Sequence, residues 1–482
     1  MEKILKLVIS TWLLIFSQLI FAAQEEVLKI PLHASSISLN PTSVQDTSSL
    51  WVARQIDCQL TRSSSSNIIM EAAKSIKFIN STQLQITIRD DVRFNDGSPV
   101  TASDVIASLN NIKSGRHVLR SVFLWIKDIK ELNDKNILID LTGSYPQFLS
   151  VLSSSNYAIF KKDFIAKAAQ NSELWNYPVG CGGYKVIQNT ANKIILKSLK
   201  NGYNIEFFLM KDNQLLANQL GSYDISDLHL VGSAKALNDY RIVNLFDPYQ
   251  VFLGLNSQHG IWRDRNNRCS FISKLDTKKV LGEYGDIARK ADDLLPQGIF
   301  GYKSNDTVFQ SIKDEYFTNA LPQLNSFCLA YLSVSIPQDY LNEYLNMTKN
   351  IYPNQKVIKI KDTSHFGERL LNSGCDVFIV GLKSNTFDAY DMLDPFSNID
   401  ANFTGFSNQK VIKSIKNSQS IFDPNLRFQE YRSIINEIES ECVIYPILTI
   451  PYRQVYIKKD LITPNIGKGP INDYYLGQVY RE

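Results

Sequence analysis

Residues 86–112, with the sequence ITIRDDVRFNDGSPVTASDVIASLNNI, constrain the fold of this chain more than any other stretch. Apolar residues alternate with polar ones in its first part, as in a strand with one buried face, and Asp96 with Gly97 forms a tight-turn pair. Thr101 followed by Asp104 is typical of a helix start, where short polar side chains cap free backbone N–H groups and acidic ones favour the positive end of the helix dipole. The stretch therefore predicts a strand that is followed by a capped helix.

Residues 94–109, FNDGSPVTASDVIASL, resemble the most distinctive motif of the extracytoplasmic solute-binding proteins of the peptide/nickel ABC importers, the oligopeptide/dipeptide-binding family. Further blocks follow in the family's order and at similar spacing. Residues 38–41 with 46–49 resemble its opening block, and residues 177–185 resemble its glycine-rich Pro-Val-Gly segment. The stretch that enters its second lobe is matched by residues 252–256, Arg268 with Asp276, and 294–298. Because these blocks lie in register over nearly the whole chain, it is identified as a member of that family.

The amino terminus has the pattern of a secretory signal peptide. A short basic start at Lys3 and Lys6 precedes an apolar run, and small residues end the segment at position 23. An uncleaved membrane anchor is the alternative, because the apolar run approaches bilayer-spanning length. No cysteine follows the run until Cys58, so we expect no lipid-bearing N-terminal cysteine and a freely diffusing periplasmic protein after cleavage.

The length and composition predict several domains and are compatible with an oxidising compartment. A chain of 482 residues with 44% hydrophobic content exceeds what one core usually supports. A formal net charge of +3, without a dense lysine and arginine block, predicts no nucleic-acid partner. The six cysteines are compatible with disulfides in an oxidising compartment, but the sequence does not select their pairing. Cys328 and Cys375 lie on apolar, strand-like segments, so we expect them to be buried free thiols.

Residues 326–382 alternate strand-like and helix-like segments in a β-α-β-α-β order. This pattern predicts parallel strands with crossover helices, and hence an α/β lobe whose sheet is covered on both faces. Residues 268–290 and 425–441 carry helical signals, the latter with an apolar stripe that we interpret as core packing. Residues 443–457 are rich in isoleucine, tyrosine and valine, contain two prolines, and are interpreted as strands that return through a hinge.

The resemblance implies an α/β, two-lobed periplasmic binding protein fold with mixed sheets and an additional inserted small domain. In this numbering the signal peptide covers residues 1–23, and the first lobe is discontinuous. The predicted pieces are residues 24–45, 176–254 and 452–482 for the first lobe, 46–175 for the inserted domain, and 255–451 for the second lobe.

Such a protein closes two lobes around its solute, so ligand-binding residues are expected on both sides of the cleft. From the first lobe the resemblance nominates Ser35, Ser36 and Ile37, just ahead of the opening block. Their backbone groups would pair with an extended ligand as an added strand. The alternative is that they form an ordinary strand end.

In the second lobe, residues 391–395, DMLDP, resemble the family's D-x-x-D-P motif, whose first aspartate receives the α-ammonium group of a peptide. Asp391 is therefore the leading ligand-binding candidate, and Asp394 is the second. A desolvated carboxylate opposite an ammonium group gains a charge-assisted hydrogen bond. The alternative is that both aspartates merely cap a turn before Pro395.

The sequence departs from the family pattern close to that motif. Leu382 stands where a tryptophan is common, and residues 382–391, LKSNTFDAYD, lengthen the connection to the motif. We therefore expect a remodelled pocket. No clear basic residue is found to hold a peptide carboxylate; Lys383 and Arg369 are the candidates.

These observations predict a periplasmic protein that captures a small solute, foremost a peptide, and delivers it to the membrane permease of an ABC importer. We expect a monomer with no cofactor and no metal in its site. Catalysis is not expected, because the G-x-S-x-G, H-E-x-x-H and G-x-x-x-x-G-K-[ST] signatures are absent. Two alternatives stay open: a metal-chelate carrier of the nickel type, with His33 and His365 as candidate ligands, and a non-transporting periplasmic sensor or chaperone with the same fold.

Overall fold

The computed structural model describes most of the chain. The described residues are 26–43, 46–64, 67–114, 125–153, 157–200, 202–211, 214–216, 219–227, 229–231, 238–284, 288–304, 307–333, 341–361, 365–384, 386–398, 400–464, 466, 476–477 and 479–481. The predicted signal peptide, residues 1–23, lies outside them. None of the helices within these ranges combines the length and the apolar character that a membrane crossing requires.

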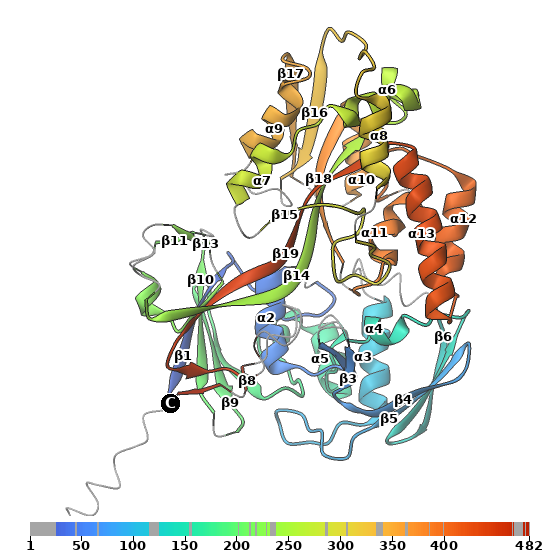
Figure 1. Cartoon of the computed structure of the whole chain (residues 1–482). Helices are drawn as coiled ribbons and strands as arrows, with labels where there is room; N and C mark the ends of the chain where they lie inside the picture. The colour runs from blue at the N-terminus through green and yellow to red at the C-terminus, as the bar shows by residue number, and fades with distance from the viewer. Residues whose placement is uncertain are drawn as a thin grey trace, which may run out of the picture.

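The first lobe contains a four-stranded sheet with the order β1-β10-β9-β8 (Figure 1). Its strands are β1 (Val27–His33), β8 (Tyr184–Asn189), β9 (Lys193–Ser198) and β10 (Asn204–Met210). β1 pairs with β10 in parallel, and the other neighbours pair antiparallel. Helix α2 (Thr47–Ile56) is N-capped by Asp46 and contributes Trp51 and Ile56 to the core of this sheet.

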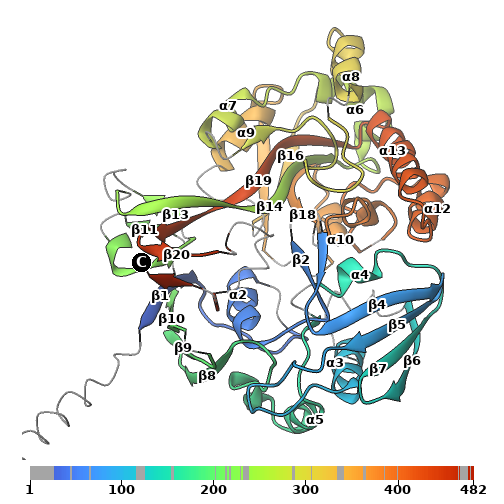
Figure 2. The same ribbon diagram turned by 60° about the horizontal axis from the view of Figure 1, so that its bottom comes forward.

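The inserted domain has its own antiparallel sheet, with the order β4-β5-β7-β6. Its elements are the β2 (Thr61–Ser64) and β3 (Asn67–Met70) hairpin, β4 (Ala73–Asn80), β5 (Gln83–Ile88), α3 (Ala102–Ser114), β6 (Ile126–Asn133), β7 (Asn136–Leu141), α4 (Phe148–Val151), α5 (Lys162–Gln170) and η3 (Ser172–Asn176). In both views α4 lies on the side of this domain that faces the second lobe (Figures 1 and 2).

The helix predicted within residues 86–112 is confirmed as α3. The predicted strand is confirmed only in part, because β5 ends at Ile88 and the alternation at Val92 and Phe94 lies beyond it. Alternate residues of β5 are buried, as its apolar pattern requires. The Asp104 carboxylate accepts hydrogen bonds from the backbone N–H of Thr101 at 2.9 Å and from its hydroxyl at 2.6 Å, which fixes the start of α3.

A mixed sheet with the order β12-β19-β14-β18-β16-β17 runs from the first lobe, which holds its β12 end, into the second lobe. Its strands are β12 (Ile225–Ser226), β14 (Tyr240–Leu255), β15 (Arg289–Lys290, beside β19), β16 (Phe327–Leu332), β17 (Gln355–Ile360), β18 (Val377–Lys383) and β19 (Ile444–Lys458). β16 pairs in parallel with both β17 and β18, which confirms the predicted β-α-β-α-β order. The connections contain α9 (Leu341–Lys349) and α10 (Phe366–Asn372).

The remaining helices of the second lobe pack on the two faces of that sheet. They are α6 (Arg265–Ser273), α7 (Lys278–Tyr284), α8 (Val308–Tyr316), α11 (Tyr390–Leu393), α12 (Gln409–Ser418) and α13 (Pro424–Ser440). The helical signal of residues 268–290 is thus divided between α6, α7 and the short strand β15. The apolar stripe of α13 is buried in the core, as predicted, through Tyr431, Ile434, Ile435 and Ile438. Shorter elements are β11 (Gln214–Leu216), η4 (Leu220–Ser222), β13 (His229–Val231), η6 (Gly260–Arg263), η9 (Asp394–Phe396), β20 (Leu461–Ile462) and β21 (Tyr480–Arg481).

Two long antiparallel strands connect the lobes. β14 and β19 pair from Tyr240 opposite Lys458 to Gly254 opposite Ile444, with an irregularity after Phe246 (Figure 1). One end of the pair is packed in the core of the first lobe and the other end in the core of the second. A pair of strands that bends at such an irregularity is suited to act as a hinge. The molecule is therefore an α/β protein of two lobes with mixed sheets.

Three disulfides join the six cysteines: Cys58 with Cys181, Cys269 with Cys442, and Cys328 with Cys375. The expectation that Cys328 and Cys375 are free thiols was wrong. The chain places β16 and β18 side by side in parallel, and this brings two cysteines 47 residues apart to a Cα–Cα distance of 4.6 Å. Neither segment by itself carries a sign of that neighbour.

The glycine-rich block of residues 177–185 lies against the end of α2. The backbone N–H of Gly182 donates to the Ile56 carbonyl at 2.7 Å. A Cβ added to Gly182 would lie 2.5 Å from the Gln55 carbonyl oxygen, and one added to Gly180 would lie 2.4 Å from that of Ile56. Only glycine leaves room for this approach, which aligns Cys181 with Cys58.

Candidate ligand-binding site

The predicted first-lobe residues follow β1. Ser35 and Ser36 are exposed, whereas Ile37 is half-buried against the first-lobe core. The segment is anchored on both sides, because Ala34 N–H donates to the Met210 carbonyl at 2.9 Å and Ser38 N–H donates to the Ser49 hydroxyl at 3.0 Å. Within the described part of the chain, the backbone groups of residues 35–37 make no hydrogen bond to other backbone groups. An extended ligand strand can pair with such an edge.

The D-x-x-D-P motif forms α11 and η9. Asp391 Oδ2 accepts hydrogen bonds from the Ser384 hydroxyl at 3.0 Å, from the backbone N–H of Thr386 at 2.7 Å, and from the Thr386 hydroxyl at 3.0 Å. Asp394 Oδ1 accepts one from the Tyr390 hydroxyl at 2.8 Å. Both carboxylates thus hold the loop that leads to Pro395, and three donors fix the orientation of Asp391. Their role as ligand-binding groups stays a prediction.

Tyrosines of the inserted domain face this loop. Burial raises the pKa of Tyr145, and the negative charges of Asp391, Asp388 and Asp394 raise it further. Burial also raises the pKa of Tyr157, again with Asp391 as the contributing charge. The negative charge of Asp391 in the second lobe thus acts on two buried tyrosines of the inserted domain, so the two bodies lie close together here.

A buried hydrogen-bond chain joins the same two bodies. Gln147 Nε2 of the inserted domain donates to the Tyr431 hydroxyl at 3.2 Å, and that hydroxyl donates to Asp388 Oδ1 at 2.5 Å. All three side chains are buried. The Arg427 guanidinium lies 3.8 Å from Asp388 Oδ2 on the other side. Sequence reasoning missed these residues, because no motif marks a contact between positions 284 residues apart.

Two further contacts close the interface around this chain of hydrogen bonds. The Ser144 hydroxyl donates to the Ser420 carbonyl at 2.9 Å, and the rings of Phe78 and Phe422 meet edge to face with centroids 5.2 Å apart. Both pairs join the inserted domain to the segment between α12 and α13. The inserted domain therefore rests directly on the second lobe.

The lengthened connection of residues 382–391 packs on the hinge strands. The ring centroid of Phe246 in β14 lies 5.6 Å from that of Phe387 and 6.1 Å from that of Tyr452 in β19. Lys383, a candidate for holding a peptide carboxylate, forms an ion pair with Asp247 of β14. The insertion therefore links the D-x-x-D-P loop to the point where the two lobes meet.

Two other features lie apart from the predicted ligand residues. A cavity of about 580 Å³ opens between the first lobe and the inserted domain, beside the Cys58–Cys181 disulfide, and none of the predicted ligand residues lines it. His33, a candidate metal ligand, is exposed, and its Nε2 lies 3.1 Å from the Lys211 carbonyl oxygen.

Asp388 makes the free energy of unfolding depend on pH. Burial raises the pKa of Asp388 to about 6, although the Tyr431 hydrogen bond and the Arg427 charge oppose this, against roughly 4 in an unfolded chain. At a pH between these two pKa values, Asp388 thus keeps its proton in the folded protein but has released it in the unfolded chain. This contribution to stability is complete below about pH 4 and is lost as the pH rises through about 6.

We therefore expect the wild type to lose about 1 kcal/mol of unfolding free energy relative to Asp388→Asn between pH 5 and pH 7. Paired urea titrations at the two pH values measure this difference. The comparison with the asparagine variant removes the contribution of every other titrating group. A difference between the two proteins that stays constant with pH would contradict the assignment.

Comparisons with known proteins agree with this architecture. The model of the family "Bacterial extracellular solute-binding proteins, family 5 Middle" matches residues 67–316. The oligopeptide-binding protein AppA of Bacillus subtilis is 21% identical over 449 residues, which cover 82% of this chain and 80% of AppA.

Two solved structures illustrate the likeness in fold. The dipeptide-binding protein of Pseudoalteromonas sp. SM9913, in complex with Met-Leu, superposes with a TM-score of 0.77 at 15% identity, over 95% of this chain and all of the other. The murein tripeptide-binding protein MppA of Escherichia coli gives 0.74 at 17% identity, over 95% and 99%. Since the family match spans just over half of the 482 residues, the chain belongs to the bacterial extracellular solute-binding proteins of family 5.

Proposed function

We propose that this protein captures a peptide between its two lobes in the periplasm and delivers it to the membrane permease of an ABC importer. The observation that carries the proposal is the position of the Asp391 carboxylate, which second-lobe donors orient beside the inserted-domain tyrosines. A peptide ammonium group at Asp391 would sit between the second lobe and the inserted domain.

The binding energy in this proposal comes from two kinds of contact. The peptide backbone pairs with residues 35–37 at the end of β1, and the ammonium group forms a charge-assisted hydrogen bond with Asp391. A solute shifts the equilibrium towards the closed form only by as much as it binds that form better. In this proposal the hydrogen bond from Gln147 to Tyr431 stabilises the closed form without contacting the solute.

The nature of the similar proteins supports a peptide over other solutes. AppA is an oligopeptide-binding protein, the Pseudoalteromonas protein holds a dipeptide, and MppA binds a murein tripeptide. In this chain Lys383 already pairs with Asp247. We propose that the carboxyl end of the peptide is left without a fixed anchor and that peptides of several lengths are accepted. The protein would act as a monomer and without catalysis.

Mass spectrometry of the protein purified from periplasm tests the proposal, because it identifies the solute that stays bound to the protein. A mixture of short peptides in the released fraction is the expected result. A released sugar or metal complex would overturn the peptide assignment. Calorimetry of the stripped protein with peptides of two to five residues then measures the preferred length, and the absence of binding across the whole series would also contradict the proposal.

A further inference from the structure

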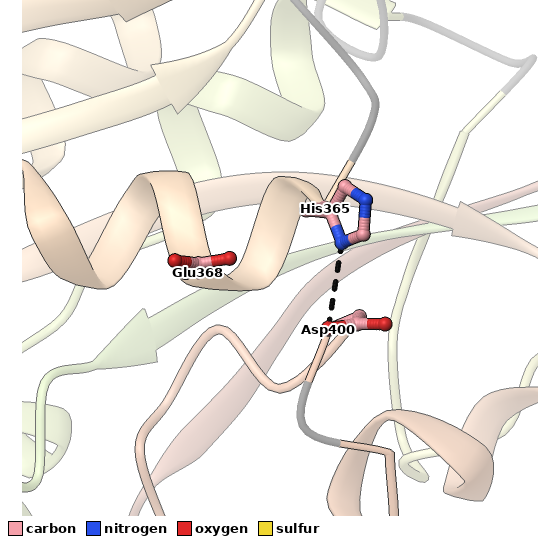
Figure 3. A group of neighbouring side chains, drawn as sticks. All are labelled: His365, Glu368 and Asp400. Carbon is pink, nitrogen blue, oxygen red and sulfur yellow. Dashed lines mark ion pairs between the residues drawn. The ribbon is translucent and has the colours of Figure 1, made fainter.

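Three potential metal ligands meet on the surface of the second lobe. His365 precedes α10, Glu368 lies in the first turn of that helix, and Asp400 comes from the loop after η9. One ligand atom from each residue lies within 4.8 Å of the others, and His365 Nδ1 is 3.4 Å from Asp400 Oδ1. Figure 3 shows the imidazole facing the Asp400 carboxylate, with Glu368 on the same helical turn. All three side chains are exposed to solvent.

The backbone holds the two ligand-bearing segments together. The Gly367 N–H donates to the Asp400 carbonyl at 3.1 Å. A Cβ on Gly367 would lie 2.5 Å from the Ala401 carbonyl carbon and 2.6 Å from the Asn402 nitrogen, so the loop is packed directly on the first turn of α10. The separation of the three ligands is therefore set by packed backbone and does not depend on flexible loops closing around an ion.

The two carboxylates of the cluster favour the binding of a cation. Within the described residues no lysine or arginine forms an ion pair with Glu368 or Asp400, and the neighbour of the Glu368 carboxylate is the Asn372 amide at 3.4 Å. Two carboxylates held this close repel each other, and a bound divalent ion reverses the sign of that interaction.

The ligand set also indicates the class of metal. An imidazole nitrogen favours zinc, nickel, copper and iron over magnesium and calcium, which prefer oxygen ligands alone. The imidazole and the two carboxylates together occupy three of the coordination positions that such an ion uses, and water fills the rest. We propose that His365, Glu368 and Asp400 form a surface site for a divalent transition-metal ion, with zinc as the probe ion. The site shares no residue with the predicted peptide site.

Calorimetric titration of the metal-stripped protein with zinc chloride tests this proposal. His365 has a φ of 50°, which asparagine tolerates better than most residues, so His365→Asn removes the imidazole with little strain. Glu368→Gln and Asp400→Asn remove the charges at constant shape. We expect one strong zinc site in the wild type and a loss of affinity of roughly 10-fold or more in each variant.

His259→Asn is the matched control. His259 is also a solvent-exposed histidine beside a carboxylate, with Nε2 3.9 Å from Asp376 Oδ1, but no third ligand joins it among the described residues. Its zinc affinity should equal that of the wild type. Zinc should also raise the unfolding temperature of the wild type and of His259→Asn equally, and that of His365→Asn less. Unchanged binding in the three site variants, an equal loss in the control, or no zinc binding by the wild type would overturn the site.

Discussion

Replacing Asp391 by asparagine is expected to lower the affinity for a peptide with a free amino terminus by roughly 30-fold or more. Removing one partner of a desolvated charge pair costs about 2–5 kcal/mol, and 2 kcal/mol corresponds to about 30-fold. Asparagine keeps an oxygen that accepts from Ser384 and Thr386, so the loop retains its hydrogen bonds while the charge is lost. Isothermal calorimetry with a peptide that the wild type retains gives the measurement.

The same peptide with an acetylated amino terminus is the control for this experiment. It carries no ammonium group, so its affinity for the wild type and for Asp391→Asn should be similar. An equal loss for both peptides would show that the substitution disturbs the pocket and would remove the ammonium contact from the proposed mechanism. An unchanged affinity for the free-amine peptide would leave Asp391 with its structural role in the loop alone.

Replacing Cys58 and Cys181 by alanine should lower the free energy of unfolding by about 3–5 kcal/mol. The disulfide joins residues 123 positions apart and closes nearly the whole inserted domain into one loop. A cross-link over so long a segment removes much of the conformational entropy of the unfolded chain, about 5 kcal/mol for a loop of this length. Urea unfolding of the double variant against the wild type, both oxidised, measures the effect.

The Cys328–Cys375 pair provides the matched comparison, because it closes a loop of only 47 positions. By the same reasoning its double alanine variant should lose about 1 kcal/mol less than the Cys58–Cys181 variant. A smaller effect for the longer loop would indicate that the unfolded inserted domain keeps structure of its own. The result therefore also tests whether the inserted domain retains structure in the unfolded state.

Several elements of the fold follow from short stretches of sequence. The alternation before Asp96 predicts β5 in part, because the strand already ends at Ile88. Thr101 with Asp104 predicts the start of α3, and residues 326–382 predict the parallel β16, β17 and β18. Each of these depends on interactions between residues close in sequence: side-chain periodicity, a helix cap, or a repeated order of elements. The helical signal over residues 268–290 was less informative, because the range is divided between two helices, α6 and α7, and the short strand β15.

The candidate site was predictable only in part. A motif led to Asp391, but its three hydrogen-bond donors and the facing Tyr145 and Tyr157 lie in segments that carry no motif. In the sequence, Gln147 is an ordinary polar residue, and Tyr431 is one residue of the apolar stripe of a helix. Their contact exists because two separately folded bodies meet there, and no local pattern encodes where two bodies meet.

By itself the sequence determined the family, the order of helices and strands in residues 326–382, and the loop that carries the carboxylates, because these depend on neighbours along the chain. Only the tertiary structure decided which cysteines pair, that Gln147 reaches Tyr431 across 284 residues, and that His365, Glu368 and Asp400 converge. Such contacts depend on the path that the backbone takes between the positions that meet. A single residue type at one position holds no information about that path.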